Sequence, residues 1–141
     1  MNNINPSLWG GDFWRAMHYI TISYPDNPRD RDKENMNLFF QSVGRILPCE
    51  KCRVHFAQNL LKYPLTDDVL SSRYNLINWL RNIHNEVNKE LNKKQWSYQD
   101  VIDYYSKDKA GLSCAEILTI CLLILIIVIV VVYVKYVRKN A

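Results

Sequence analysis

The sequence predicts an all-α protein, in which a bundle of four helices and a short fifth helix are followed by one membrane-spanning helix. Three observations support this fold class. Apolar residues recur at helical spacing between residues 7 and 91, and no run alternates as a strand would. The turn segments "YPDNP" (24–28) and "YPLTDD" (63–68) divide this pattern. Residues 117–134 carry no charge, which is typical of a helix that crosses about 30 Å of hydrocarbon.

The helix boundaries follow from these turns and from capping residues. The predicted ranges are 7–23, 31–47, 49–62, 72–91 and a short helix after Trp96. Ser72 is a suitable N-cap for the fourth helix, and Ser97 with Asp100 outlines a capping box for the fifth. Pro48 ends the second helix, so the third should begin at Cys49.

The chain organisation that we predict is a domain over 1–108, a linker over 109–116, a membrane helix over 117–134 and a basic tail over 135–141. A domain of this size has no interior that could surround the apolar helix. The N-terminus has no basic region before an apolar run, so it does not resemble a secretory signal. Three of the 18 Lys and Arg residues follow the span, and all 14 Asp and Glu precede it. The domain is thus close to neutral, which argues against nucleic-acid binding.

The stretch "ILPCEKCRVHF" (46–56) holds Cys49 and Cys52 as a C-x-x-C pair. A zinc site needs four ligands, whereas the three histidines fall on separate predicted helices. A purely structural disulfide over so short a loop restrains the unfolded chain little. A redox pair is favoured, because a helix N-terminus stabilises the Cys49 thiolate. We expect Cys49 to be the exposed attacking thiol and Cys52 the buried partner.

Aromatic and polar residues gather on two predicted helices. Trp14 and His18 share one face of the first helix, being four residues apart. The fourth helix is crowded with Trp79, Arg81, His84, Asn85 and Asn88. These groups could be core residues whose hydrogen bonds are satisfied within the protein. They would also suit a flat aromatic ligand with hydrogen-bonding edges.

Three blocks of sequence resemble the Erv/ALR family of FAD-linked sulfhydryl oxidases. They are "GGDFWRAMHYITISYP" (10–25), "FFQSVGRILPCEKC" (39–52) and "NWLRNIHNEVNKELNKKQW" (78–96), in the family's order and spacing. The resemblance covers about residues 9–105. It implies a five-helix domain that cradles FAD at the mouth of a four-helix bundle. The family's usual glycine before Lys93 is Asn92 here, a residue that tolerates positive φ.

The resemblance also implies roles for individual residues. Cys49 and Cys52 would be catalytic, with Cys49 toward the substrate and Cys52 toward the flavin. The cofactor-binding residues that it implies, together with the crowded polar positions of the fourth helix, are Gly10, Trp14, His18, Trp79, Arg81, His84, Asn85, Val87, Asn88, Lys93, Tyr104 and Tyr105. No metal ligand is predicted. A thioredoxin-like or other dithiol protein would supply electrons, and O₂ would accept them as H₂O₂.

Two departures shape the remaining expectations. Family members often carry a second, shuttle cysteine pair, which the predicted domain lacks. The C-terminal anchor and the few cysteines resemble members encoded by large cytoplasmic DNA viruses, which would place the oxidase domain in the cytosol. A homodimer is expected from the family and from the apolar first and second helices. The alternative to an enzyme is a membrane-tethered helical adaptor whose C-x-x-C binds metal or is a vestige.

Overall fold

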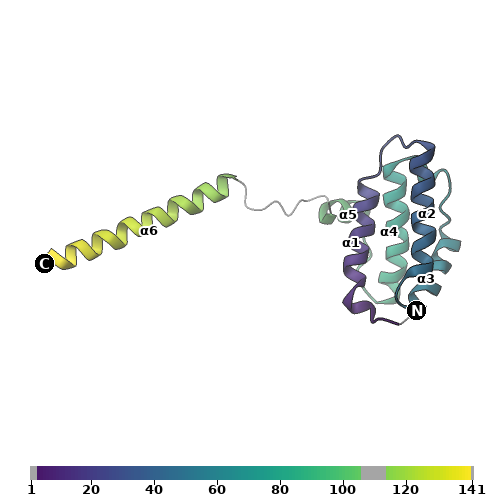
Figure 1. The fold of residues 1–141 in the computed structure, drawn as a ribbon, viewed down its shortest axis with the longest axis horizontal. Helices are drawn as coiled ribbons and strands as arrows, with labels where there is room; N and C mark the ends of the chain where they lie inside the picture. Colours follow the sequence, from purple (N-terminus) through teal and green to yellow (C-terminus); the bar gives the residue numbers. More distant parts are fainter. Residues whose placement is uncertain (1–2, 106–113, 141) are drawn as a thin grey trace. The chain divides into compact units, whose positions relative to one another are not determined.

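A computed structural model describes residues 3–105 and 114–140, and every regular element within these ranges is helical (Figure 1). The α-helices are α1 (Gly10–Ile22), α2 (Asp30–Ile46), α3 (Glu50–Lys62), α4 (Arg73–Glu90), α5 (Tyr98–Tyr105) and α6 (Cys114–Asn140). Two 3₁₀ turns, η1 (Pro6–Leu8) and η2 (Val69–Ser71), precede α1 and α4. The all-α prediction is confirmed. The first helix begins at Gly10 and not at Ser7, because Asn5 caps the separate turn η1 through the Ser7 N–H at 3.0 Å.

The chain divides into two compact units between Lys107 and Asp108. In the first unit α4 is the central helix, in contact with α1, α3, α5 and η2 (Figure 1). The largest buried cluster joins α1, α2 and α4, and Phe40 lies edge-on against Trp79 with ring centres 4.6 Å apart. A smaller cluster of Ile77, Val101 and Tyr105 attaches α5. The resulting bundle fixes which face of α4 remains free for a site.

Capping residues set the ends of the helices as the sequence predicts. Ser72 Oγ accepts the Asn75 N–H at 3.2 Å, so Ser72 is the N-cap of α4. Ser97 and Asp100 form the reciprocal capping box of α5, with backbone N–H bonds of 2.8 and 3.0 Å. Asn92 has a φ of 53° and ends α4, because the Lys93 N–H then reaches the Asn88 carbonyl at 2.7 Å. This turn brings Lys93 back beside the end of α4.

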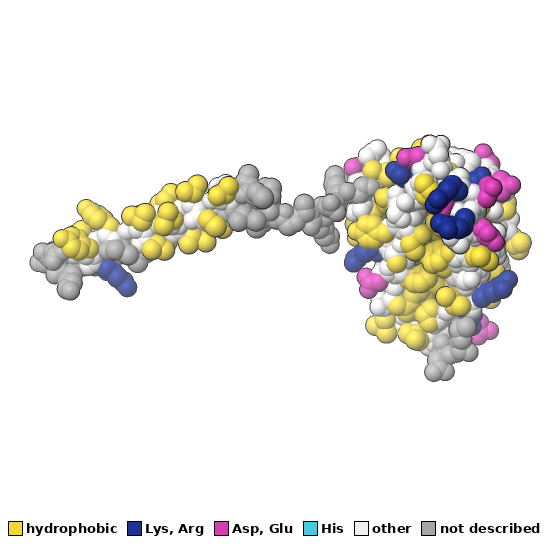
Figure 2. All heavy atoms as spheres, turned by 45° about the horizontal axis from the view of Figure 1, so that its top comes forward, with side chains coloured by type: hydrophobic (Ala, Val, Ile, Leu, Met, Phe, Trp, Pro, Cys, Tyr) yellow, Lys and Arg dark blue, Asp and Glu magenta, His cyan; other side chains and the backbone are white. Residues whose placement is uncertain are grey.

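The second unit is the helix α6, whose segment Leu118–Arg138 is long and apolar enough to cross a membrane. Figure 2 shows hydrophobic side chains along this helix. The predicted span 117–134 lies within α6, and the helix continues through residues 135–140 of the predicted tail. Residues 109–113 of the predicted linker lie outside the described residues.

Candidate active site

A cavity of about 1200 Å³ opens in the first unit between the N-terminal segment, α1, the start of α3, the end of α4 and α5. Ten of the residues that the sequence predicts for the site line it: Gly10, Trp14, Cys49, Cys52, His84, Val87, Asn88, Lys93, Tyr104 and Tyr105. The fold thus gathers residues from distant parts of the chain around one cavity. Both cysteines and the aromatic residues line the same cavity.

The C-x-x-C pair is a disulfide between Cys49 and Cys52 at the start of α3. Cys49 is the N-cap of the helix, and its Sγ accepts the Cys52 N–H at 3.1 Å. Arg53 donates from its guanidinium to the Leu47 carbonyl at 2.6 Å, which fastens the turn before the pair. The helix N-terminus therefore lies directly at the Cys49 sulfur, where it stabilises negative charge once the disulfide is opened.

The exposure of the two cysteines is the reverse of our prediction. Cys49 is only 6% exposed, whereas Cys52 is half-buried and lines the cavity. A segment that the sequence pattern does not reveal, residues 3–8, lies beside Cys49, and we call it the N-terminal strap. The Ile4 N–H donates to the Pro48 carbonyl at 2.7 Å, and Asn3 Oδ1 accepts the Glu50 N–H at 3.1 Å. The strap is thus bonded to both residues that flank Cys49.

A buried pair of histidines forms the aromatic side of the site. His18 Nε2 and His84 Nδ1 are 3.0 Å apart, and His84 stacks on Trp14 with ring centres separated by 4.0 Å. The His18 ring in turn stacks on Tyr105 at 4.5 Å. Burial, with the neighbouring His84 as a smaller cause, lowers the pKa of His18 to about 3. Burial, and then the charge of Lys93, lowers the pKa of His84 to about 4. Both rings are therefore neutral at pH 7.

The histidine pair predicts a loss of stability in mild acid. Both folded-state pKa values lie below the ordinary 6.5, so between about pH 6.5 and 4 the unfolded chain binds more protons. The free energy of unfolding should be highest above pH 6.5 and fall below it, by up to about 2 kcal/mol per pH unit near pH 5. Urea unfolding of residues 1–108 at several pH values measures this. A His18→Gln/His84→Gln variant should show a flatter profile, and an equally steep one would contradict the assignment.

Four predicted site residues do not line the cavity. His18 lies one layer behind it, against His84. Trp79 packs in the core and donates from Nε1 to the Tyr63 carbonyl at 2.8 Å. Arg81 bonds to its neighbour Asn82 at 2.8 Å. Asn85 holds the backbone of Trp96 through two bonds of 2.8 Å, so it positions an aromatic ring of the cavity wall.

Among the cavity residues that the sequence did not indicate, His55 and Trp96 are the most informative. His55 lines the cavity one helical turn after Cys52, and its Nδ1 is 2.8 Å from Glu90 Oε2 at the end of α4. The spacing C-x-x-C-x-x-H was the available signal, since residues three apart share a face. Trp96 also lines the cavity, with its ring centre 5.0 Å from that of Tyr104. Its position just before the α5 capping box gave no hint of this role.

The residues present fit a large, flat and polar-edged ligand such as FAD. The cavity exceeds the roughly 300–1,000 Å³ of sites for drug-sized ligands. Within the described part of the chain, Asn88 Nδ2 is buried without a hydrogen-bond partner on the cavity wall. Burial raises the pKa of Tyr105 to about 12, and its protonated hydroxyl is available as a hydrogen-bond donor. A buried amide donor, a phenol, a lysine and stacked rings match the needs of a flavin nucleotide.

Comparison with known proteins decides the family. A model of the Erv1 / Alr family matches residues 11–106, more than half of the chain. The chain belongs to the Erv1/Alr family. Among its relatives in this family is a probable FAD-linked sulfhydryl oxidase of Acanthamoeba polyphaga mimivirus, 44% identical over 104 residues. That match covers 74% of this chain and 73% of the relative. The FAD-linked sulfhydryl oxidase of African swine fever virus is 35% identical, over 70% of this chain and 81% of the relative.

Solved structures of the Erv1/Alr family share this fold. The crystal structure of the yeast Erv1 core has a TM-score of 0.67 and 27% identity, covering 77% of this chain and 89% of that one. The FAD-binding domain of Erv1 from Saccharomyces cerevisiae has the same TM-score with 26% identity, over 73% of this chain and 95% of that one. The resemblance read from the three sequence blocks is therefore confirmed.

Proposed function

We propose that this protein is an FAD-dependent sulfhydryl oxidase that converts protein dithiols to disulfides and reduces O₂ to H₂O₂. The observation that supports this most directly is the Cys49–Cys52 disulfide on the wall of the cavity that fits a flavin nucleotide. Membership of the Erv1/Alr family agrees with it. The adaptor alternative leaves the cavity, the neutral histidine pair and the disulfide without a purpose.

The sulfur chemistry follows from the position of the pair. A substrate thiolate attacks Cys49 Sγ, a mixed disulfide forms, and the Cys49–Cys52 bond breaks with Cys52 leaving as a thiolate. A second substrate thiolate then attacks the substrate sulfur of the mixed disulfide. The substrate becomes a disulfide, and its electron pair remains on the reduced Cys49–Cys52 pair. The N-terminus of α3 stabilises Cys49 as the leaving thiolate in this second step.

The cavity residues would hold FAD against this pair. Trp14 and His84 offer stacked faces, Asn88 and Tyr105 offer hydrogen-bond donors, and Lys93 offers a positive charge for a phosphate group. Bound FAD would supply a two-electron acceptor that reoxidises the cysteine pair and is itself reoxidised by O₂. The half-buried Cys52, which lines the cavity, is the sulfur that we assign to the flavin side.

We propose that the dithiol substrate attacks Cys49 directly, and that no shuttle cysteine pair of this chain passes the electrons on. Apart from the catalytic pair, the sequence contains only Cys114 and Cys121, and both belong to the second unit. A shuttle pair is thus absent from the oxidase unit. The electron donor that we propose is a thioredoxin-like or other dithiol protein that reaches Cys49 directly.

Purification of residues 1–108 tests the function. The protein should be yellow with the visible absorption of oxidised flavin, and it should consume O₂ with dithiothreitol while releasing one H₂O₂ per thiol pair. A colourless protein that carries zinc would support the adaptor alternative. A protein that contains flavin and oxidises dithiothreitol but releases no H₂O₂ would indicate another electron acceptor.

We further propose that α6 anchors the enzyme in a membrane as a single C-terminal span, with the oxidase unit in the cytosol of an infected cell or in a virion membrane. The support is the apolar segment Leu118–Arg138 and the relatives from large DNA viruses. The full chain should stay with membranes after alkaline carbonate extraction. Protection of the oxidase unit from protease in intact microsomes would contradict the cytosolic side.

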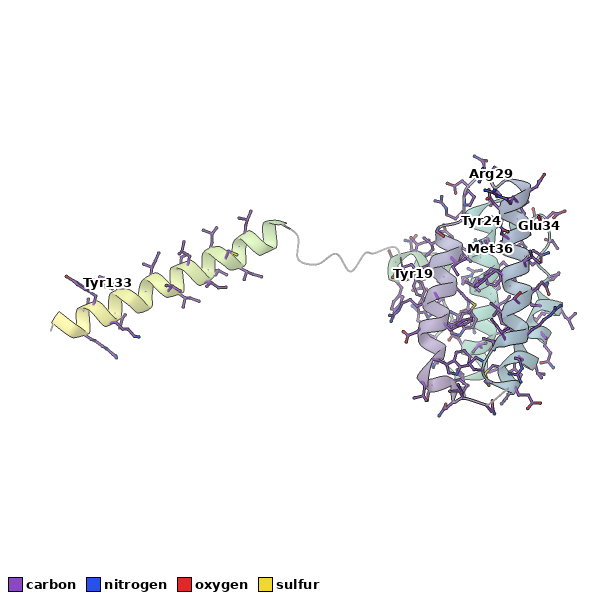
Figure 3. All side chains as sticks on the ribbon, viewed as in Figure 1. Tyr19, Tyr24, Arg29, Glu34, Met36 and Tyr133 are labelled. Atoms are coloured by element: carbon purple, nitrogen blue, oxygen red, sulfur yellow. A yellow bond between two sulfur atoms is a disulfide. The ribbon has the colours of Figure 1, made fainter. Side chains whose placement is uncertain are left out.

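A homodimer through the face of α1 and α2 is also proposed. Figure 2 shows hydrophobic side chains gathered on the visible face of the first unit, and Figure 3 labels Met36 on α2. Met36 and Phe39 are only partly buried there. Light scattering after size exclusion should give a dimer that Met36→Glu dissociates. Leu61→Glu is the control, because Leu61 is 84% exposed on α3. A monomeric native oxidase unit would rule the dimer out.

A further inference from the structure

The backbone on both sides of Cys49 is already hydrogen-bonded to the N-terminal strap. The strap forms hydrogen bonds with two backbone groups that flank the cysteine, the Pro48 carbonyl and the Glu50 N–H. It is held lightly, because Ile4 is 46% exposed and Leu8 is 75% exposed. One more bond, 3.3 Å from Trp9 Nε1 to the Ile4 carbonyl, ties it to the body.

Thiol–disulfide exchange requires the substrate sulfur to reach Cys49 Sγ. Cys49 is only 6% exposed, and the strap is hydrogen-bonded to the residues on both sides of it, so we infer that Asn3 and Ile4 stand in the way of a protein thiol. The other open side of Cys49 is the cavity, which the proposed function assigns to the flavin. The strap must therefore move before a protein substrate can react.

We propose that the surface under the strap is the docking site for the substrate polypeptide, which binds there extended and replaces the strap. This rests on the proposed oxidase function. An extended peptide carries one N–H and one C=O per residue, and these match the Pro48 carbonyl and the Glu50 N–H that the strap now satisfies. Among the dithiol proteins proposed above, this favours a cysteine in an unfolded or flexible segment over a folded thioredoxin-like protein, since only such a segment offers free backbone groups beside its thiol.

The test measures how fast the Cys49–Cys52 disulfide is reduced in the full-length protein. Reduced, unfolded ribonuclease A serves as the protein dithiol and dithiothreitol as the small one, with anaerobic acid quench, thiol alkylation and mass spectrometry as the readout. This readout needs neither flavin turnover nor O₂, so it succeeds or fails independently of the oxidase assay. Three variants are compared. One is a truncated chain in which an initiator Met is followed directly by Asn5, and the other two are Asn3→Ala and Asn3→Asp.

Removing the strap should make the protein dithiol reduce the Cys49–Cys52 disulfide about 5- to 30-fold faster. This factor corresponds to the net free energy of one or two hydrogen bonds. The gain with dithiothreitol should be smaller, because the small thiol needs less room and no backbone pairing. Asn3→Ala should give part of the gain, whereas Asn3→Asp keeps an acceptor for the Glu50 N–H and should give none. Unchanged or slower reduction after truncation would overturn the proposal, and so would equal gains for both thiols.

A substitution at Glu50 tests the docking bonds themselves. Glu50 is the first residue of α3, where proline is tolerated, and Cys49 has the extended backbone that a following proline requires (φ −151°, ψ 120°). In the truncated chain, Glu50→Pro removes the N–H and should slow the protein dithiol about fivefold relative to dithiothreitol. Glu50→Gln retains the N–H and should leave that ratio unchanged. A ratio that Glu50→Pro does not move would refute backbone docking.

Discussion

Cys52→Ser is expected to retain flavin and to lower O₂ consumption with dithiothreitol on the order of 10³-fold or more. The variant has no Cys49–Cys52 disulfide for a substrate thiolate to open. No second sulfur remains on the cavity wall to carry the electron pair onward, because Cys52 is the half-buried member of the pair that lines the cavity. An oxygen electrode gives the rate, and the flavin absorbance of the purified variant gives the occupancy.

The matched control for Cys52→Ser is Cys121→Ser. Cys121 is an exposed free cysteine of α6 and belongs to the other compact unit. Its replacement should leave both the flavin content and the rate unchanged. Full turnover in Cys52→Ser would sink the proposed route of the electrons, whatever the control shows.

His84→Ala is expected to weaken flavin binding. The alanine removes the ring that stacks on Trp14, a contact of about 0.5–1.5 kcal/mol. It also leaves His18 Nε2 buried without its partner, which costs about 1–3 kcal/mol. Trp14 and His18 should therefore no longer be held in place. The flavin affinity should fall at least about tenfold, the equivalent of 1.4 kcal/mol. Equilibrium dialysis against FAD measures the affinity, and thermal unfolding measures the stability.

Two further variants separate the causes of that loss. His84→Phe keeps a flat ring against Trp14 and removes only the nitrogen that faces His18. It should bind flavin more tightly than His84→Ala. Asn78→Ala is the control on the same helix, because the Asn78 side chain only donates to the Tyr74 carbonyl. Native flavin affinity in His84→Ala would contradict the placement of the cofactor.

The helices and their ends could be predicted because local groups determine them. Ser72, the Ser97–Asp100 box and Asn92 each act within a few residues, and all three behave as the sequence indicates. That Trp14, His84 and the cysteines lie around one cavity could be predicted only from the family resemblance. Their proximity depends on contacts between distant segments of the chain. The residue pattern alone left those groups as either core or ligand-binding.

Trp79 and Arg81 show why residue type could not define the cavity wall. With 3.6 residues per turn, Trp79 lies about 180° around α4 from Asn88, so it points into the core beside Phe40. Arg81 lies on nearly the same face as Asn88 but about 10 Å along the axis. The sequence block 78–96 therefore contains residues that pack α4 against the other helices as well as residues that line the cavity. Flavin binding by these two residues stays a prediction that their alanine variants can test.

The strap escaped prediction for a different reason. Its bonds use the Pro48 carbonyl and the Glu50 N–H, backbone groups that every sequence possesses, across more than forty positions of the chain. Only Asn3 contributes a side chain to them. The exposure of Cys49 thus depends on a tertiary contact that leaves no composition or spacing signal.

Helix α4 has a consequence for the fate of the protein in the cell. One face of this helix supplies the core residues Leu76, Leu80 and Ile83, and the next turns supply His84 and Asn88 to the cavity. A ligand that binds only the folded form adds about 2.7 kcal/mol at a hundred times its dissociation constant. Newly made chains that find no flavin would therefore unfold more often and be cleared by proteases. The riboflavin supply of the cell would then regulate how much of this protein survives, as well as how much of it is active.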